Sequence, residues 1–187
     1  GSDGGSDVLP ADRAPPCAPG PRLTQPASAE LRDNFVSTGR VSYELRLVMN
    51  NALDIPAGLL ATCGAPEAVV PLADQFWAWQ TTMFDNLKNA GDAKMQGLSA
   101  LPDAQRPAAL AQLAGMDQFF AARGVAADQG KACLTNQAKT EGLVKASDGW
   151  LKSYDVQGTP TFFVNGKKAD YNTWQPMKAE LERLGAR

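Results

Sequence analysis

The sequence has no histidine among its 187 residues, and this absence narrows its chemistry at once. It excludes the usual general base near neutral pH, the commonest metal ligand, and any nucleophile that depends on a neighbouring imidazole. Cys17, Cys63 and Cys133 are the only cysteines, and zinc sites need ligands paired a few residues apart. Glycine-rich phosphate loops are also absent. We therefore expect no metal and no cofactor, and the chemistry left open is thiol chemistry or none.

Long hydrophobic runs are absent as well, since no apolar stretch approaches the roughly 18 residues that span a bilayer. The net charge of -2 gives no reason to expect nucleic acid or an acidic membrane surface as a partner. No signal peptide stands at the start, so we expect any secreted form to be already processed. The length and the hydrophobic content of 44% favour one globular domain, or one domain with a large insertion.

Two elements are predicted directly after the first 27 residues. Ser28 is suited to cap a helix that buries Leu31, Phe35 and Val36, and Gly39 is suited to end it. The next stretch, VSYELRL at 41–47, alternates strictly between apolar and polar residues, which predicts a half-buried strand.

A helical block is predicted over residues 54–154. A short helix should end near Cys63, and a second helix should carry Trp77 and its apolar neighbours. A third should run from Leu110 to Gly124, and a fourth region should extend from Cys133 through Leu151. After the block, Asn172 or Thr173 is suited to cap a last helix, whose apolar residues recur at helical spacing: Trp174, Met177, Leu181 and Leu184. We interpret the aromatic and methionine positions of these helices as core residues.

A hairpin is predicted between the block and the last helix. Gly158 gives the backbone freedom, and Pro160 belongs at the start of a strand because it has no N–H to donate. The β-branched and aromatic residues 161–164 suit a buried strand. Asn165-Gly166 is a strong signal for a tight turn with positive φ at both residues. On these residues alone, an ordinary edge hairpin is an open alternative.

The hairpin stretch VQGTPTFFVNGK at 156–167 resembles the cis-proline strand of thioredoxin-fold disulfide oxidoreductases, most closely that of the DsbA-like branch. The resemblance implies that the Thr159-Pro160 bond is cis. It also implies that Thr159 and Pro160 bind substrate, because the backbone before the proline pairs with an extended peptide in that family. A purely structural role for Pro160 is the alternative.

The predicted order of elements also resembles that family: an α/β, thioredoxin-like fold with an inserted helical domain. This implies a thioredoxin-like domain from residues 28–53 and 155–187, and an inserted helical domain from residues 54–154. Residues 1–27, rich in proline, glycine and alanine, are predicted to be a loop, a disordered segment or an atypical N-terminal segment. Their first six residues look like an expression scar or a flexible lead-in.

A structural disulfide is implied by the same resemblance. The stretches 38–46, 59–64 and 132–134 are similar to alphaproteobacterial periplasmic DsbA-like proteins, whose members carry a second disulfide in the helical domain. Cys63 and Cys133 occupy the matching places. Such a bridge would stabilise the fold by about 4 kcal/mol in loop-closure terms and would indicate an oxidising compartment. Two buried free cysteines are the alternative.

The redox motif of that family, Cys-x-x-Cys, is missing. The nearest match is APPCA at residues 14–18, in which Cys17 would stand at the resolving position and Ala14 would replace the nucleophile. Cys17 is therefore the candidate catalytic residue, and a chance exposed thiol is the alternative. The odd cysteine also leaves open an intermolecular Cys17–Cys17 dimer.

The first strand of the fold, which is central in its sheet, has only a poor candidate in residues 7–13. Three explanations are open. Asp7-Val8-Leu9 substitutes weakly for the strand, the segment is degenerate, or a shifted reading frame in a GC-rich gene alters the sequence before Ser28.

The resemblance implies a thiol-disulfide oxidoreductase or protein-disulfide isomerase acting on secreted protein thiols, with an incomplete redox site in this sequence. Its partners would be unfolded or extended polypeptides and a membrane redox partner protein, with no nucleic acid and no metal. Its place would be the periplasm or the outside of the cell. The alternative is a redox-inactive thioredoxin-fold module that binds peptides or acts as a chaperone.

Overall fold

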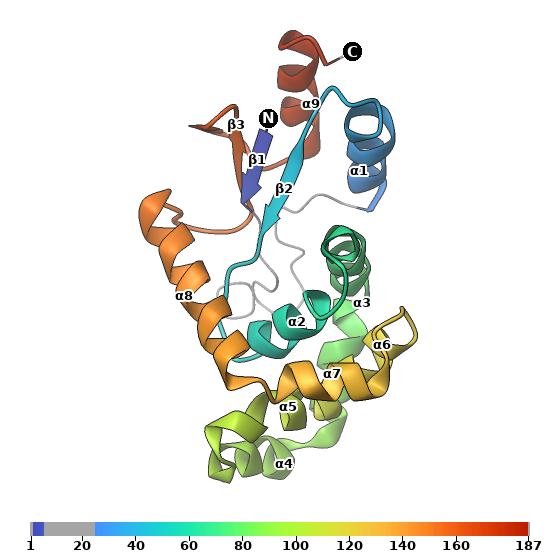
Figure 1. Cartoon of the computed structure of the whole chain (residues 1–187), viewed down its shortest axis with the longest axis vertical. Helices are drawn as coiled ribbons and strands as arrows, with labels where there is room; N and C mark the ends of the chain where they lie inside the picture. The colour runs from blue at the N-terminus through green and yellow to red at the C-terminus, as the bar shows by residue number, and fades with distance from the viewer. Residues whose placement is uncertain (1, 6–24, 187) are drawn as a thin grey trace.

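A sheet with the strand order β2-β1-β3-β4 lies at one end of the computed structural model, which describes residues 2–5 and 25–186 (Figure 1). Its strands are β1 Ser2–Gly5, β2 Tyr43–Arg46, β3 Thr161–Val164 and β4 Lys167–Lys168. β1 is parallel to β2 and antiparallel to β3, and β3 and β4 form an antiparallel hairpin. The thioredoxin-like fold with inserted helices is thereby confirmed.

The central strand β1 corrects a prediction about the N-terminal segment. The first six residues were predicted to be an expression scar or a flexible lead-in, and residues 7–13, the poor candidate for the first strand, lie outside the described residues. Instead Ser2–Gly5 pairs with β2 on one edge and with β3 on the other. A strand between two others pairs its backbone on both edges, so this ladder stabilises a segment whose side chains have little β propensity.

The first helix begins earlier than predicted. α1 spans Gln25–Glu30 and continues directly as the π-helical turn η1, Leu31–Val36. Ser28 therefore lies inside the helix and does not cap it, and its hydroxyl donates a hydrogen bond to Asp74 Oδ1 at 3.3 Å.

The apolar face of the first helix packs against the sheet and α9, Trp174–Arg183. Its Leu31 and Phe35 are buried, as predicted, whereas Val36 is only partly buried. Together these elements bury one hydrophobic cluster: Ala27, Leu31, Phe35, Val41, Phe162, Val164, Trp174, Met177, Leu181 and Ala186. Thr173 is the residue before α9, but its side chain makes no capping hydrogen bond.

The predicted helical block is helical, with more breaks than expected. Its elements are α2 Asp54–Ala61, η2 Pro66–Ala68, α3 Val69–Ala90, α4 Asp92–Gly97, η3 Leu98–Ala100, η4 Asp103–Gln105, α5 Arg106–Ala114, α6 Met116–Ala121, α7 Ala127–Leu134 and α8 Gln137–Ser153. Together they form the end of the molecule away from the sheet, and α8 runs back toward the sheet (Figure 1).

Two predicted helices are split, and each break coincides with a capping hydrogen bond. Gly115 has a φ of 76° between α5 and α6, and a Cβ there would lie 2.7 Å from Asn86 Nδ2. That amide donates a hydrogen bond to Ala114 O at 2.9 Å and so caps the end of α5. Between α7 and α8, the Asn136 side chain accepts a hydrogen bond from Lys139 N at 2.9 Å, which starts a new helix.

A second hydrophobic cluster lies within the helical block and is separate from the first. Phe76 packs against Phe119 and Phe120 with ring centroids 5.7 and 5.6 Å apart. Most of the aromatic and methionine positions predicted to be core are buried. Two separate clusters support the division into a thioredoxin-like part and an inserted helical part, which remains our proposal.

Candidate functional site

The predicted hairpin places Thr159 and Pro160 directly before β3. The bond between them is cis, as the resemblance implied, and both residues are half-buried. Asn165 and Gly166 have φ values of 50° and 78°, which confirms the predicted turn. Thr161, the first residue of β3, is the register partner of Gly5, the last residue of β1. The chain thus leaves β1, on its way toward Cys17, at the same end of the sheet at which Pro160 enters it.

The loop before Pro160 is held at both ends. Asp155 follows the end of α8 with a φ of 47°, and Lys168 Nζ donates a hydrogen bond to Asp155 O at 2.5 Å. Val156 N donates to Leu151 O at 3.1 Å, which turns the chain away from the helix. At the other end, the Thr161 hydroxyl donates to Gly158 O. We refer to residues 155–160 as the proline loop.

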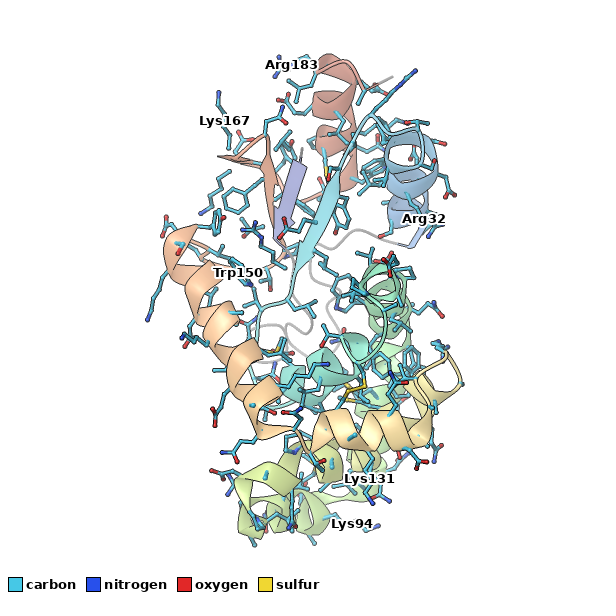
Figure 2. The ribbon with its side chains drawn as sticks, viewed as in Figure 1. Arg32, Lys94, Lys131, Trp150, Lys167 and Arg183 are labelled. Carbon is cyan, nitrogen blue, oxygen red and sulfur yellow. A yellow bond between two sulfur atoms is a disulfide. The ribbon has the colours of Figure 1, made fainter. Side chains whose placement is uncertain are left out.

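An arginine held between aromatic rings lies beside the proline loop. The Arg46 guanidinium is 4.5 Å from the ring centroid of Trp150 and 4.7 Å from that of Tyr154. Trp150 lies where the end of α8 approaches the sheet (Figure 2). A small cavity of about 20 Å³ joins this group to the loop and is lined by Arg46, Val48, Trp150, Tyr154, Val156, Thr159 and Phe163.

The sequence predictions missed this arginine group, although the spacing within each of its two residue pairs is regular. Glu44 and Arg46 are two residues apart on a strand and so share a face, and Trp150 and Tyr154 are four apart on a helix. Nothing in the sequence indicates that the strand pair contacts the two aromatic residues, because most of the helical block lies between them in the chain.

Cys63 and Cys133 form a disulfide, with their Cα atoms 5.9 Å apart. It ties the end of α2 to α7, inside the helical part and away from the proline loop. Lys139 Nζ donates to Thr62 O at 2.7 Å and lies 3.8 Å from Cys133 Sγ. Burial lowers the pKa of Lys139. Cys17, the candidate catalytic residue, lies outside the described residues.

Comparison with known proteins agrees with this geometry. A family model described as thioredoxin matches residues 14–183. The chain belongs to this thioredoxin family, in its DsbA-like branch. A solved structure, a protein-disulfide isomerase from Novosphingobium aromaticivorans, is similar to it with a TM-score of 0.80 and 25% sequence identity. The match covers 98% of this chain and 92% of the other. No curated protein matches the sequence.

Membership of the DsbA-like family implies protein substrates, and members are commonly extracytoplasmic. Within residues 2–5 and 25–186, no helix has the length and apolar character to cross a membrane. In that same part of the chain, no group of three or more acidic or cysteine side chains is arranged to hold a metal ion.

A groove of about 210 Å³ separates the first helix of this DsbA-like protein from α3. Asp74 lines it together with Ser28, and burial raises the pKa of the Asp74 carboxyl, while the Ser28 hydrogen bond opposes that rise. Apolar side chains from both helices form the rest of the lining, among them Leu31, Val36 and Val70. The groove lies on the helix that follows Cys17 in the chain.

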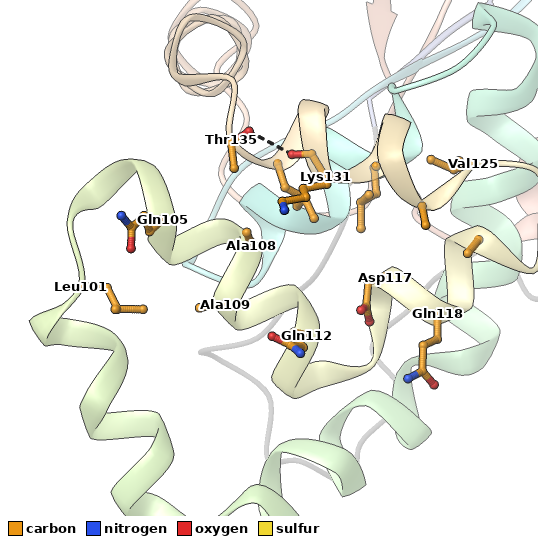
Figure 3. Close-up of a pocket in the computed structure, with 15 residues that line it drawn as sticks. Leu101, Gln105, Ala108, Ala109, Gln112, Asp117, Gln118, Val125, Lys131 and Thr135 are labelled. Carbon is orange, nitrogen blue, oxygen red and sulfur yellow. Dashed lines mark hydrogen bonds between the residues drawn. The ribbon is translucent and has the colours of Figure 1, made fainter.

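A larger cavity, of about 680 Å³, lies in the helical part between α5, α6 and α7 (Figure 3). Leu101, Ala108, Ala109 and Val125 provide apolar surface, and Gln105, Gln112 and Asp117 provide polar groups around it. None of the site residues predicted from the sequence lines this cavity, so the proline loop remains the candidate site.

Proposed function

We propose that this DsbA-like protein binds extended segments of secreted polypeptides at the proline loop and exchanges their disulfides through Cys17. The placement of Thr159 and Pro160 directly before β3, at the end of the sheet where β1 ends, carries the proposal. A peptide laid along the proline loop would pair with the loop backbone by main-chain hydrogen bonds, which are largely independent of the peptide's sequence. Unfolded and extended substrates fit such a surface.

The proposed chemistry uses one thiolate. The Cys17 thiolate attacks a substrate disulfide R–S–S–R′, which forms a Cys17–S–S–R bond and releases R′–S⁻. A second thiolate of the substrate then attacks the mixed disulfide, forms a new substrate disulfide and restores the Cys17 thiolate. No electrons are gained or lost overall, so the reaction is isomerisation. Net reduction of a substrate needs an external thiol to release Cys17.

A complete dithiol cycle is not part of this proposal because the chain lacks a partner for Cys17. The sequence has three cysteines, and two of them are joined in the helical part. The redox site is therefore incomplete in this sequence.

The test is insulin reduction with an external dithiol, comparing the wild-type protein with Cys17→Ser. We expect wild type to accelerate the reaction above the uncatalysed rate and Cys17→Ser to fall to that rate. Equal rates for both proteins would contradict thiol exchange through Cys17.

The same missing partner cysteine favours a second candidate, a redox-inactive module that binds peptides or acts as a chaperone. It predicts peptide binding without insulin reduction. An extended peptide and its backbone N-methylated counterpart test this, since N-methylation removes main-chain donors and leaves the side chains unchanged. Binding of the first peptide only, by a protein inactive in the insulin assay, would support this candidate.

Localisation in the periplasm or outside the cell belongs to the same proposal. The Cys63–Cys133 disulfide supports it, because structural disulfides persist in oxidising compartments. A membrane redox partner protein would be needed only by a chain with a complete dithiol.

A further inference from the structure

Arg46 combines burial with three specific contacts at the point where β2 meets α8. Its side chain is only 15% exposed, and its Nε donates to Glu44 Oε1 at 2.7 Å. The guanidinium is within 5 Å of two ring centroids, those of Trp150 and Tyr154. The Glu44 hydrogen bond, first among several causes, raises the pKa of Arg46, so the group stays charged. A partly desolvated cation over aromatic faces is a favourable arrangement.

The arginine group is in close packing with the proline loop. Tyr154 lies edge-on to Phe163, with ring centroids 5.3 Å apart, and Phe163 belongs to the strand that follows Pro160. The cavity that Arg46, Tyr154, Thr159 and Phe163 help to line has a volume of about 20 Å³. Such a volume holds about one water molecule, so there is little free space in which Thr159 can shift without moving these side chains.

We propose that Arg46 is a positioning residue for the proline loop. By fixing the end of α8 against β2, it sets where the chain turns toward Thr159 and thereby holds the loop backbone in place for the substrate. The identity of that substrate as an extended peptide rests on the proposed function; the ordering of the loop does not. Arginine suits this role because its planar group stacks on both rings while it pairs with a carboxylate.

The chain offers a matched control for this proposal. Arg123 also stacks on an aromatic ring, 3.7 Å from the centroid of Phe119, and its Nε donates to Gln75 Oε1 at 2.9 Å. It lies in the helical part, away from the proline loop. Arg46→Met and Arg123→Met therefore remove the same kind of contact in two places.

The experiment measures amide hydrogen exchange over residues 155–161 and the affinity for an extended peptide, well below the Tm of each variant. We expect Arg46→Met to speed exchange of these amides and to weaken peptide binding, each about tenfold, as for loss of a partly desolvated cation–π interaction. We expect Arg123→Met to change neither. If both variants lower the Tm and leave exchange and affinity at wild-type values, Arg46 is merely structural and the proposal is overturned.

Two more variants keep the test decisive. Arg46→Lys retains a charge opposite Glu44 without the planar group, so we expect most of the loss to persist; full recovery by lysine would overturn the role of the planar guanidinium. Should Arg46→Met fail to fold, Trp150→Phe weakens the stack more mildly and should still speed exchange in the loop; unchanged exchange would overturn the proposal. If wild type binds no peptide, the proposed function fails, while the exchange data still decide on Arg46.

Discussion

The helical part and the sheet part of this DsbA-like protein are held together in different ways. In the helical part, Phe76, Phe119 and Phe120 pack against one another, and a disulfide spans α2 and α7. In the sheet part the described strands are four residues long or shorter, and the central one is Ser2–Gly5. The sheet part is therefore stabilised more by backbone pairing and by contacts between segments far apart in the chain.

One such contact joins α1 to α9, the first and last helices of the chain that the structure describes. Trp174 Nε1 on α9 donates to Glu30 Oε2 on α1 at 2.6 Å, and Lys178 pairs with the other oxygen. Lys178 and then Trp174 lower the pKa of Glu30. The comparison teaches that the helical part has the larger buried cluster, while the candidate site lies where the helical part meets the less extensively packed sheet.

The largest expected effect is in the aromatic cluster of the helical part. Phe120 is fully buried, so Phe120→Ala should lower the free energy of unfolding by about 3–5 kcal/mol through lost burial and the cavity left behind. Urea unfolding measures it. Leu184→Ala, at a residue 45% exposed, is the control and should change stability by less than about 0.5 kcal/mol. Similar losses for both would contradict the account of this core.

The disulfide gives the next largest effect. The double variant Cys63→Ala, Cys133→Ala should lose about 4 kcal/mol of unfolding free energy, because the bridge no longer restricts the unfolded chain. Reductant should destabilise wild type similarly and leave the double variant unchanged. Intact mass after alkylation should show one blocked thiol in wild type before reduction and three after it. Three thiols without reduction would show that the bridge does not form.

The pH dependence of stability at Asp74 tests the contact between the two parts, because this α3 residue accepts a hydrogen bond from Ser28 on α1. Burial raises its pKa above the ordinary 3.8, so the folded state binds a proton more readily than the unfolded state. Stability contributed by this group is therefore lost as pH rises from the unfolded pKa through the folded one. Asp74→Asn should be more stable than wild type at pH 7, and the difference should vanish below pH 3.8. A variant less stable than wild type at pH 7 would show that the Ser28 hydrogen bond outweighs burial.

The smallest effect is expected at Lys168, the exposed residue that contacts Asp155 in the proline loop. Its ammonium lies 3.9 Å from Asp155 Oδ2, and both side chains are substantially exposed. Lys168→Met should change the free energy of unfolding by less than about 1 kcal/mol, because water screens such pairs. Thermal unfolding is sufficient to measure this. A loss of unfolding free energy well above about 1 kcal/mol would contradict this, because it would mean that water does not screen the contact.

The features that the sequence predicted well are those with local causes. Asn165-Gly166 fixes a turn, and the spacing of Trp174, Met177 and Leu181 fixes the buried face of α9. The disulfide and the cis bond came from the family resemblance and agree with the structure.

The features that the sequence did not predict depend on distant partners. β1 forms because β2 and β3 provide backbone groups on both sides, whatever its side chains prefer. Gly115 breaks a helix because Asn86, from another helix, caps α5 there. Arg46 contacts rings more than 100 positions away, at Trp150 and Tyr154, and no local pattern contains that contact.

The central claim is that an extended peptide binds at the proline loop and reacts with Cys17. The most direct measurement uses a peptide whose cysteine is activated as a thiopyridyl disulfide, with mass mapping of the labelled residue and a backbone N-methylated peptide for comparison. The Cys17 thiolate would take the peptide sulfur and release thiopyridone. We predict one peptide per chain, on Cys17, forming at least about tenfold faster than with the N-methylated peptide. Attachment to Cys63 or Cys133, or equal rates for the two peptides, would contradict the account.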